Sequence, residues 1–457
     1  MKRRLAGLVR RKTTTTRQPS SYAIETRGCQ MNVSDSGIVR RMLEKEYRET
    51  SVEEAEMVLL NTCAIRDKAE QKVWTRIGEL KKEGKRVGVL GCMAERLKGD
   101  LLKHVEVVAG PDSYRGLPGL LKTGGVDARL GRETYADVRT NLNFVSIQRG
   151  CDNMCSFCVV PFTRGRERSR PVESIVAECE GRRGEITLLG QNVNSYADFT
   201  VGGSLLEHTT GFEPFVARKK NAGSAVRFAE LLSRVSEAAP EARIRFTSPH
   251  PKDFPDDLLD AIAQIPNVAK NIHLPAQSGS NEVLARMRRG YQVETYEALV
   301  ERARERIPNV TFSSDFIAGF CGETEEDHEK TLGLIRRVGY DNAFLFKYSK
   351  RPKTHAAYRY EDDVPVEVKK RRLNELISEF DKGRRRLAEE AVGRVHSVLF
   401  EGPAPKQPHT HWVGTNDARR KVIFPMAHHF FLKKGEDFVR VRVKETNGTA
   451  LFGDIVS

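Results

Sequence analysis

Short apolar runs alternate with helical patterns along most of the chain, and this alternation restricts the fold more than any other feature. In the first third, three apolar runs have the length of buried parallel strands, at residues 22–25, 57–60 and 87–90. Helical patterns separate them, such as those at residues 36–44 and 68–82. Strands that alternate with helices form parallel sheets covered by helices. The sequence therefore predicts a doubly wound α/β domain over residues 22–123, followed by a linker over residues 124–140.

A second alternating series begins at residue 144. Its apolar runs predict six strands, at residues 144–148, 185–189, 243–247, 271–274, 311–317 and 343–347. Helical patterns lie between them, including residues 228–238, 294–307 and 325–338. We therefore expect an open, partial (β/α)6 barrel over residues 141–390, with its chemistry at the C-terminal ends of the strands. Residues 197–225 are rich in Gly, Thr and Lys without clear periodicity, which predicts an inserted surface loop.

The last part of the chain changes character again. A charged helical pattern at residues 364–390 leads into residues 391–457, where alternating runs are separated by Gly and Pro turns. These runs lie at residues 398–400, 421–424 and 438–443. Short alternating strands with frequent turns predict a small antiparallel β-barrel.

The chain is basic, with a formal net charge of +14 over 457 residues. Such an excess favours polyanionic partners, although a solvated basic surface explains it as well. Residues 1–21 are basic, rich in hydroxyl side chains and free of acidic residues, since the first acidic residue is Glu25. That composition is typical of a mitochondrial transit peptide, with a disordered basic tail that contacts RNA as the alternative. No apolar stretch is long enough for a membrane span.

Three cysteines follow directly after the first strand of the second series. Residues 151–158 read CDNMCSFC, so Cys151, Cys155 and Cys158 have the spacing CxxxCxxC. Structural zinc sites usually combine two separated pairs into four ligands, and here no fourth Cys or His is near. Three thiolates on a four-iron cluster would leave one iron open to a small molecule. A four-iron cluster is the favoured interpretation, with a zinc or ferredoxin-like site as the alternative.

Three more cysteines each follow a predicted strand of the first domain: Cys29, Cys63 and Cys92. Parallel strands bring their C-terminal ends to one edge of a sheet, so three distant cysteines can converge there. The alternative is three unrelated core thiols, because cysteine often packs as a small apolar residue. Clustered cysteines in a long chain without a secretory signal more often bind metal than form disulfides. The pattern therefore predicts a second cluster, again with an open iron.

These motifs resemble a known enzyme family. The CxxxCxxC motif, with Phe157 before its last cysteine, resembles the signature of the radical S-adenosylmethionine (SAM) superfamily. The segments TRGCQMN, NTCAIRDKAEQKV, GCMAER, LLGQNVNSY, HLPAQSGS and SSDFIAGFCGETEEDH resemble its methylthiotransferase branch. The resemblance extends over residues 22–457 and is closest to the enzymes that modify isopentenyladenosine in tRNA. Within that group it is closest to the eukaryotic mitochondrial members, which share the insertion and a KTHA-like run at residues 353–356. The C-terminal barrel resembles the TRAM domain, an RNA-binding module.

The resemblance implies cofactors, a substrate and partners. The cofactors would be SAM and two 4Fe-4S clusters, one on Cys151, Cys155 and Cys158 and the other on Cys29, Cys63 and Cys92. The first would generate a 5′-deoxyadenosyl radical and the second would deliver sulfur. The product would carry a methylthio group at C2 of an N6-isopentenyladenosine in the tRNA anticodon loop. Electron-donor and sulfur-supply proteins would be further partners, in the mitochondrion or alternatively the cytoplasm. The rival functions are a sister methylthiotransferase, acting on threonylcarbamoyladenosine or a ribosomal protein, and a non-catalytic iron–sulfur RNA-binding protein.

Individual site residues follow from the same resemblance. Those expected to contact SAM are Phe157, Gly190, Gln191, Ser248, Asp315, Ile317 and Gly319. Arg288 and Tyr291 are candidates for binding its carboxylate or the substrate. Basic residues of the C-terminal barrel expected near RNA phosphates are Arg419, Arg420, Lys421, Arg440 and Arg442. Residues expected to pack or to line a pocket rather than to bind metal are Cys179, Cys321, His250 and His273. The segment at residues 171–185 is shorter than in relatives, so a clipped first barrel helix is expected.

Overall fold

The computed structural model describes residues 18–64, 67–128, 130–140, 142–201, 225–426 and 431–456. Most of the predicted basic tail lies outside these residues, as does most of the predicted insertion. The chain divides into two compact units, Met1–Glu133 and Thr134–Ser457. Within the described part, no helix is both long and apolar enough to cross a membrane.

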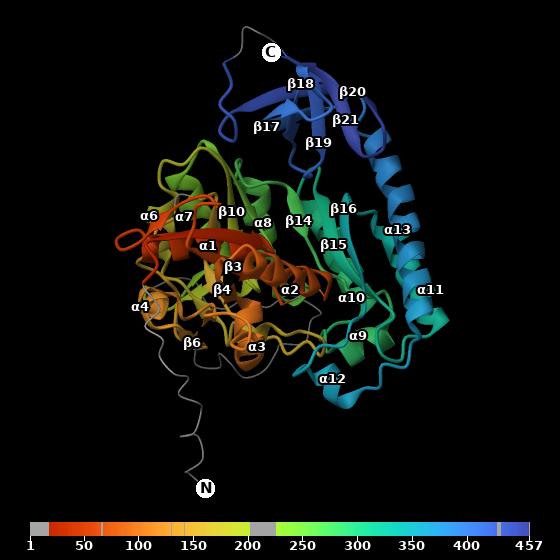
Figure 1. The fold of residues 1–457 in the computed structure, drawn as a ribbon. Helices are drawn as coiled ribbons and strands as arrows, with labels where there is room; N and C mark the ends of the chain where they lie inside the picture. Colours follow the sequence, from red (N-terminus) through yellow and green to blue (C-terminus); the bar gives the residue numbers. More distant parts are fainter. Residues whose placement is uncertain are drawn as a thin grey trace. The chain divides into compact units, whose positions relative to one another are not determined.

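The first unit, coloured from red to orange in Figure 1, is built on a parallel sheet of six strands in the order β2-β1-β3-β4-β5-β6. The strands are β1 (Ser21–Arg27), β2 (Arg48–Glu49), β3 (Met57–Thr62), β4 (Arg86–Gly91), β5 (Val107–Ala109) and β6 (Gly125–Asp127). The three predicted strands, β1, β3 and β4, are its centre. The predicted linker is wrong in its first part, because β6 forms the edge of this sheet. Its three residues are too few and too polar to be recognised as a strand.

Helices α1 (Gln30–Leu43), α2 (Asp67–Lys82), α3 (Cys92–Leu101) and α4 (Leu117–Thr123) complete the first unit. Helix α1 begins at Gln30, well before the predicted start at residue 36. Its first turns carry polar side chains that are fully buried, including Asn32, Asp35 and Ser36. Apolar periodicity cannot detect a helix whose buried face is polar.

The second unit contains all six predicted barrel strands. One parallel sheet has the order β13-β10-β7 and the other the order β14-β15-β16. A parallel bridge between Ile244 and Val268 joins β13 to the residues that precede β14. The strands are β7 (Phe144–Ser146), β10 (Gly184–Leu189), β13 (Ala242–Phe246), β14 (Asn271–His273), β15 (Thr311–Ala318) and β16 (Asn342–Lys347). This confirms the partial barrel.

Helices alternate with these strands along the chain: α6 (Val172–Cys179), α7 (Phe228–Ala238), α8 (Asp256–Gln264), α9 (Asn281–Met287), α10 (Val293–Arg306), α11 (Glu325–Val338) and α13 (Val366–Glu389). Alternate strand residues, such as Ile186 and Leu188 of β10, share one buried cluster with Leu231 of α7. Helix α6 is short, as the clipped segment led us to expect. Cys179 at its end is fully buried in the same cluster and therefore packs as a core residue.

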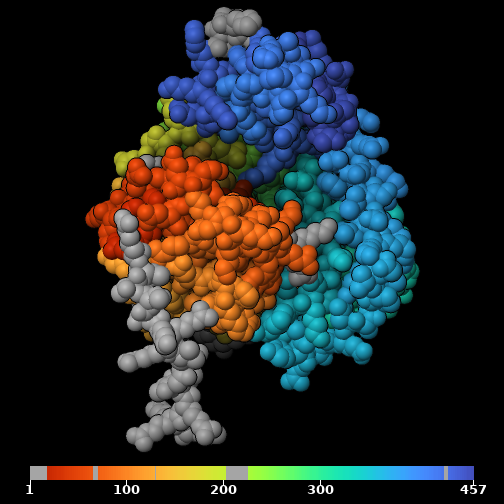
Figure 2. Space-filling model, in the orientation of Figure 1, coloured from red at the N-terminus to blue at the C-terminus, as the bar shows by residue number. Residues whose placement is uncertain are grey.

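A closed five-stranded barrel, in the order β17-β18-β19-β21-β20, ends the chain. Its strands are β17 (Val395–Ala404), β18 (Gln407–Thr415), β19 (Lys421–Pro425), β20 (Phe438–Thr446) and β21 (Ala450–Ile455). The barrel was predicted, but it is not wholly antiparallel, because β19 and β21 pair in parallel. Ala388 of α13 lies in the same apolar cluster as Val398 and Val441 of the barrel, and Figure 2 shows the two segments packed together.

Buried arginines join this small barrel to the larger one. Arg245 of β13 donates hydrogen bonds of 2.5 and 2.7 Å to the backbone carbonyls of residues 417 and 416, and a third of 2.6 Å to Glu185. Arg420 forms an ion pair of 2.9 Å with Asp341, and both side chains are at most a tenth exposed. Since an unpaired buried charge is costly, these contacts fix the loop that precedes β19 against the larger barrel.

Candidate metal centres

The CxxxCxxC segment is an irregular loop that begins two residues after β8 (Gln148–Arg149). Gly150 starts the loop with a left-handed backbone (φ +78°), and a Cβ atom there would lie 2.1 Å from the carbonyl oxygen of Arg166. No residue other than glycine fits this position. The amide of Cys151 then donates to Gly165 at 3.2 Å, which closes the loop at its base.

The centre of the loop is held by Ser156, whose side chain is fully buried. Its amide donates to Met287 at 2.9 Å and its hydroxyl to Arg286 at 2.8 Å, both at the end of α9. Its carbonyl accepts a hydrogen bond of 2.7 Å from Ala356, the last residue of the KTHA run. The KTHA run therefore supports the cysteine loop directly.

The three thiols of the loop act on one another. Burial raises the pKa of Cys158 to about 12, and the neighbouring Cys155 adds to this shift. Burial also raises the pKa of Cys151, with further contributions from Cys158 and Cys155. The thiols of Cys151 and Cys158 thus resist ionisation on their own, and a cationic centre binds such groups as thiolates and releases their protons.

Among the described residues, no group of three His, Cys, Asp or Glu side chains is close enough to share a single metal ion. A four-iron cluster does not require this, because it is a cage in which each thiolate binds a different iron atom. The loop thus fits a cluster better than a zinc ion.

The cysteines of the first unit lie at one edge of its sheet. Cys29 follows β1, Cys63 follows β3, and Cys92 is the first residue of α3, directly after β4. These strands are parallel neighbours in the order β1-β3-β4. The three residues therefore come together at the C-terminal edge, where parallel sheets commonly place their functional groups.

Asn32, which the sequence reasoning did not single out, ties these three segments together. Its side-chain oxygen accepts a hydrogen bond of 3.2 Å from the amide of Cys29. Its side-chain nitrogen donates to Asn61 at 3.0 Å and to the carbonyl of Thr62 at 3.2 Å, at the end of β3. A Cβ atom on Gly91, which has φ +87°, would lie 2.6 Å from Asn61 and 2.7 Å from Thr62. The segments before all three cysteines thus meet around one buried amide.

Two of the residues expected to bind SAM lie next to the cysteine loop. The side-chain oxygen of Gln191 accepts a hydrogen bond of 2.5 Å from the amide of Gly150. Gly190 has no space for a side chain, since a Cβ atom would lie 2.9 Å from both Gln148 and Val193. The end of β10 is therefore packed against the start of the cysteine loop.

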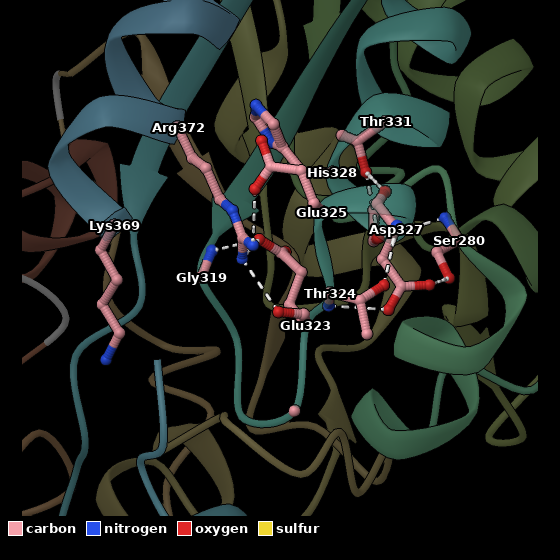
Figure 3. A network of polar contacts seen from close by, with 12 residues as sticks. Ser280, Gly319, Glu323, Thr324, Glu325, Asp327, His328, Thr331, Lys369 and Arg372 are labelled. Atoms are coloured by element: carbon pink, nitrogen blue, oxygen red, sulfur yellow. Dashed lines mark hydrogen bonds and ion pairs between the residues drawn. The ribbon is translucent and has the colours of Figure 1, made fainter. Parts of the chain in front are cut away.

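Gly319, at the end of β15, belongs to a polar network that Figure 3 shows. Its amide donates to the buried carboxylate of Glu323 at 2.7 Å, and Glu323 forms an ion pair of 3.0 Å with Arg372 of α13. A Cβ atom on Gly319 would overlap the side chain of Lys369. Burial raises the pKa of Glu323. This glycine therefore allows α13 to pack closely against the end of the barrel.

The other expected SAM contacts are also near strand ends. Asp315 and Ile317 alternate along β15 and share one of its faces, while Ser248 follows β13 with an exposed side chain and φ +58°. Phe157 packs edge-on against Phe320, with 6.5 Å between ring centroids. All seven residues thus lie at the C-terminal side of the barrel.

The hydroxyl of Tyr291 is hydrogen-bonded within the protein. This buried group donates to the backbone carbonyls of Pro275 and Ala276, at 3.2 and 3.1 Å. Arg288 is exposed and contacts His355 at 2.7 Å. The arginine that reaches the cysteine loop is its neighbour Arg289, which the sequence reasoning passed over because RRGY gives no hint which arginine is buried.

The expected phosphate contacts divide into two groups. Arg420 is buried in its ion pair with Asp341, so the prediction that it contacts RNA is wrong. Arg419 is partly buried, and burial lowers its pKa. Lys421, Arg440 and Arg442 have exposed side chains on β19 and β20 and stay candidates.

Comparisons with known proteins agree with this architecture. The Radical SAM superfamily matches residues 145–335, the TRAM domain residues 389–456, and the uncharacterized protein family UPF0004 residues 21–110. Among solved structures, the radical S-adenosylmethionine methyltransferase TsrM from Kitasatospora setae has a similar fold, with a TM-score of 0.52 at 14% identity, over 83% of this chain and 80% of that chain. The fold is that of a radical SAM protein.

Sequence relatives define the family further. The chain is 51% identical to the mitochondrial tRNA methylthiotransferase CDK5RAP1 of Mus musculus, over 90% of this chain and 75% of that protein. It is 48% identical to a CDK5RAP1-like protein of Oryza sativa subsp. japonica, over 95% and 80%. It is 43% identical to the tRNA-2-methylthio-N(6)-dimethylallyladenosine synthase of Porphyromonas gingivalis, over 96% of each. The chain belongs to the radical SAM tRNA methylthiotransferase family, and its cofactors are SAM and two 4Fe-4S clusters.

Proposed function

We propose that this chain adds a methylthio group to ring C2 of an N6-isopentenyladenosine beside the anticodon of tRNA. One observation carries the proposal: two separate cysteine triads, each at the C-terminal edge of a parallel sheet, occur in a chain 43% identical to the Porphyromonas gingivalis synthase. A protein that only binds RNA has no need of either triad.

The two triads have different roles in this proposal. Cys151, Cys155 and Cys158 hold the cluster that binds SAM, and Cys29, Cys63 and Cys92 hold the second cluster. When bound to the chain, SAM and the two clusters supply the one-electron cleavage of SAM, the abstraction of a hydrogen atom from an unactivated carbon, and the sulfur. Iron binding would release the thiol protons, and the chain keeps each loop rigid through the hydrogen bonds of Ser156 and Asn32.

The open face of the sheet β14-β15-β16 is suited to an unstacked base. Helix α13 packs on one face, where Leu345 joins the core cluster, so Phe344 belongs to the opposite face. The side chain of Phe344 is 44% exposed, and Asp315 is its partner on β15. His273 lies edge-on to Phe344 with 6.0 Å between ring centroids and 3.5 Å from Asp315. An exposed aromatic ring beside polar groups can stack on a base and bind its edge.

The basic strands of the small barrel supply the electrostatic part of tRNA binding. Arg440 and Arg442 alternate along β20 with the buried residues Val439 and Val441, so both arginines point outward. Lys421 is exposed on β19. Basic side chains on one small domain can bind the phosphates around an anticodon loop and release counterions.

The division of the chain belongs to the same proposal: a second-cluster domain at residues 22–123, a radical SAM domain at residues 141–390 with an insertion at residues 197–225, and a TRAM domain at residues 391–457. Relatives from mouse, rat and human are named mitochondrial, which together with the basic residues 1–21 favours a mitochondrial location. The reaction consumes electrons and sulfur, so separate electron-donor and sulfur-supply proteins are required.

Mass spectrometry of tRNA nucleosides tests this function. Deletion of the gene should remove 2-methylthio-N6-isopentenyladenosine and leave its precursor without the methylthio group. The intact chain should restore the modification, and a Cys151→Ala variant should not. Loss of methylthiolated threonylcarbamoyladenosine, or of the modified ribosomal protein, would instead assign a sister activity. An unchanged set of modified products would contradict any methylthiotransferase.

Phe344→Ala tests the proposed base-binding face in the purified enzyme. The variant should raise the KM for tRNA while SAM cleavage in the absence of tRNA is retained. A stacked base contributes about 1–3 kcal/mol, so we expect an interaction about 5- to 150-fold weaker. An unchanged KM would remove Phe344 from the substrate site.

A further inference from the structure

Arg289 is a buried cation beside the cysteine loop of the second unit. Only 5% of its surface is exposed. One terminal nitrogen (Nη1) lies 3.3 Å from the sulfur of Cys155, and the other (Nη2) donates to the carbonyl of Pro275 at 2.8 Å. The Nε–H group donates to the hydroxyl of Tyr291 at 3.2 Å. Each edge of the guanidinium thus has a fixed partner.

The surroundings do not balance this charge with a carboxylate. Within the described part of the chain, the hydrogen-bond partners of Arg289 are Cys155, Pro275 and Tyr291, and none of these partners is a carboxylate. The ring of His250 lies edge-on to that of Tyr291, with 5.9 Å between the two ring centroids. Burial and the charge of Arg289 lower the pKa of His250, so it stays neutral.

A buried cation without an anionic partner is strongly disfavoured. The sulfur of Cys155 is the partner that can acquire a full negative charge, and it does so when iron replaces its proton. The position of Arg289 is therefore explained if the thiolate form of Cys155 is the functional state.

We propose that Arg289 is a positioning residue of the first cluster, whose N–H group donates to the Cys155 thiolate and raises the reduction potential of that cluster. This inference rests on the proposed function, because it requires Cys155 to bind iron. Hydrogen bonds to cluster sulfurs and nearby positive charge both stabilise the more negative, reduced cluster. Arg289 thus makes the reduction that must precede SAM cleavage easier for an external electron donor.

The chain offers a matched control in Arg288. The two arginines are adjacent, but Arg288 is exposed and contacts His355 instead of the loop. Arg288→Met and Arg289→Met make the same chemical change at neighbouring positions. Arg289→Gln is a second test variant, because it removes the charge and keeps an N–H donor.

The test is a redox titration followed by electron paramagnetic resonance. All variants are full-length and carry Cys29→Ala, Cys63→Ala and Cys92→Ala, so that the signal belongs to the first cluster. The midpoint potential should be lower in Arg289→Met and Arg289→Gln than in the background protein, and unchanged in Arg288→Met. Circular dichroism and iron content verify that each variant is folded and loaded.

Two results would overturn the inference. One is an unchanged midpoint potential in a folded, iron-loaded Arg289→Gln or Arg289→Met variant. The other is an equal shift in Arg288→Met, which would indicate a non-specific effect of charge. A background protein that retains Arg289 but binds no cluster would contradict the proposed function itself, which separates the two failures.

Discussion

Replacing Asn32 with alanine should destabilise the first unit and empty its metal centre. Asn32, Asn61 and Thr62 are all fully buried. The substitution leaves the side-chain oxygen of Asn61 and the carbonyl of Thr62 without the donor that Asn32 supplies. Each buried group deprived of its partner costs about 1–3 kcal/mol. We therefore expect a loss of about 2–6 kcal/mol in the free energy of unfolding, a large part of the stability of an ordinary domain.

The fluorescence of Trp74 provides a local readout of this loss. Trp74 lies in α2 of the first unit, and the other tryptophan, Trp412, lies in the C-terminal barrel. A Trp412→Phe background therefore assigns the signal to the first unit. Urea unfolding of the apoprotein should have a lower midpoint in Asn32→Ala. After anaerobic reconstitution, the variant should bind half of the iron bound by the unsubstituted protein.

Asn267 supplies the matched control for this prediction. Its side-chain nitrogen also donates two hydrogen bonds, in this case to the backbone carbonyls of Ala239 and Ala242, but it lies in the second unit. Asn267→Ala should leave the Trp74 transition and the iron of the first unit unchanged. If Asn32→Ala unfolds at the same urea concentration as the parent and holds all its iron, the amide does not join the three cysteine segments.

Three further changes test other parts of the structure. Asp341→Ala leaves Arg420 buried without its partner and should lower the stability reported by Trp412 fluorescence by about 3–5 kcal/mol; an unchanged urea midpoint would contradict the buried pair. Gly150→Ala forces a Cβ atom against a backbone carbonyl, so the protein should lose half of its iron, and full loading would show that the loop tolerates the change. Burial raises the pKa of Cys179 from 9.0 to about 12. The folded state therefore keeps a proton that the unfolded state loses, and stability should fall between pH 9 and pH 12, by up to roughly 1.4 kcal/mol per pH unit from this thiol. Urea titrations at several pH values measure this loss in the parent and in Cys179→Ala. If the free energy of unfolding falls equally with pH in both proteins, the prediction is refuted.

The sequence alone was sufficient to predict the helices and strands that bury apolar residues. The six strands of the larger barrel and helices such as α7 and α11 have the predicted periods, because each buries one apolar face in a large core. The positions of the six cysteines after strands were also predictable, since the C-terminal ends of parallel strands share one edge.

Polar interactions between distant segments could not be predicted from the sequence. Asn32 contacts residues about thirty positions away, and Arg289 contacts Cys155 across more than a hundred. Neither partner is marked by a local pattern. Arg420 was assigned to RNA because a basic residue on a basic domain has the same appearance whether it is exposed or paired internally. The edge strand β6 was missed because the backbone, rather than its side chains, joins it to the sheet.

Quantification of iron and acid-labile sulfide tests the central claim most directly. Three anaerobically reconstituted proteins are compared: the parent, a variant with Cys151, Cys155 and Cys158 changed to alanine, and a variant with Cys29, Cys63 and Cys92 changed to alanine. Two independent clusters predict that each triple variant keeps half of the iron and sulfide of the parent. Full loading of either triple variant, or a parent that holds only one cluster, would contradict the account.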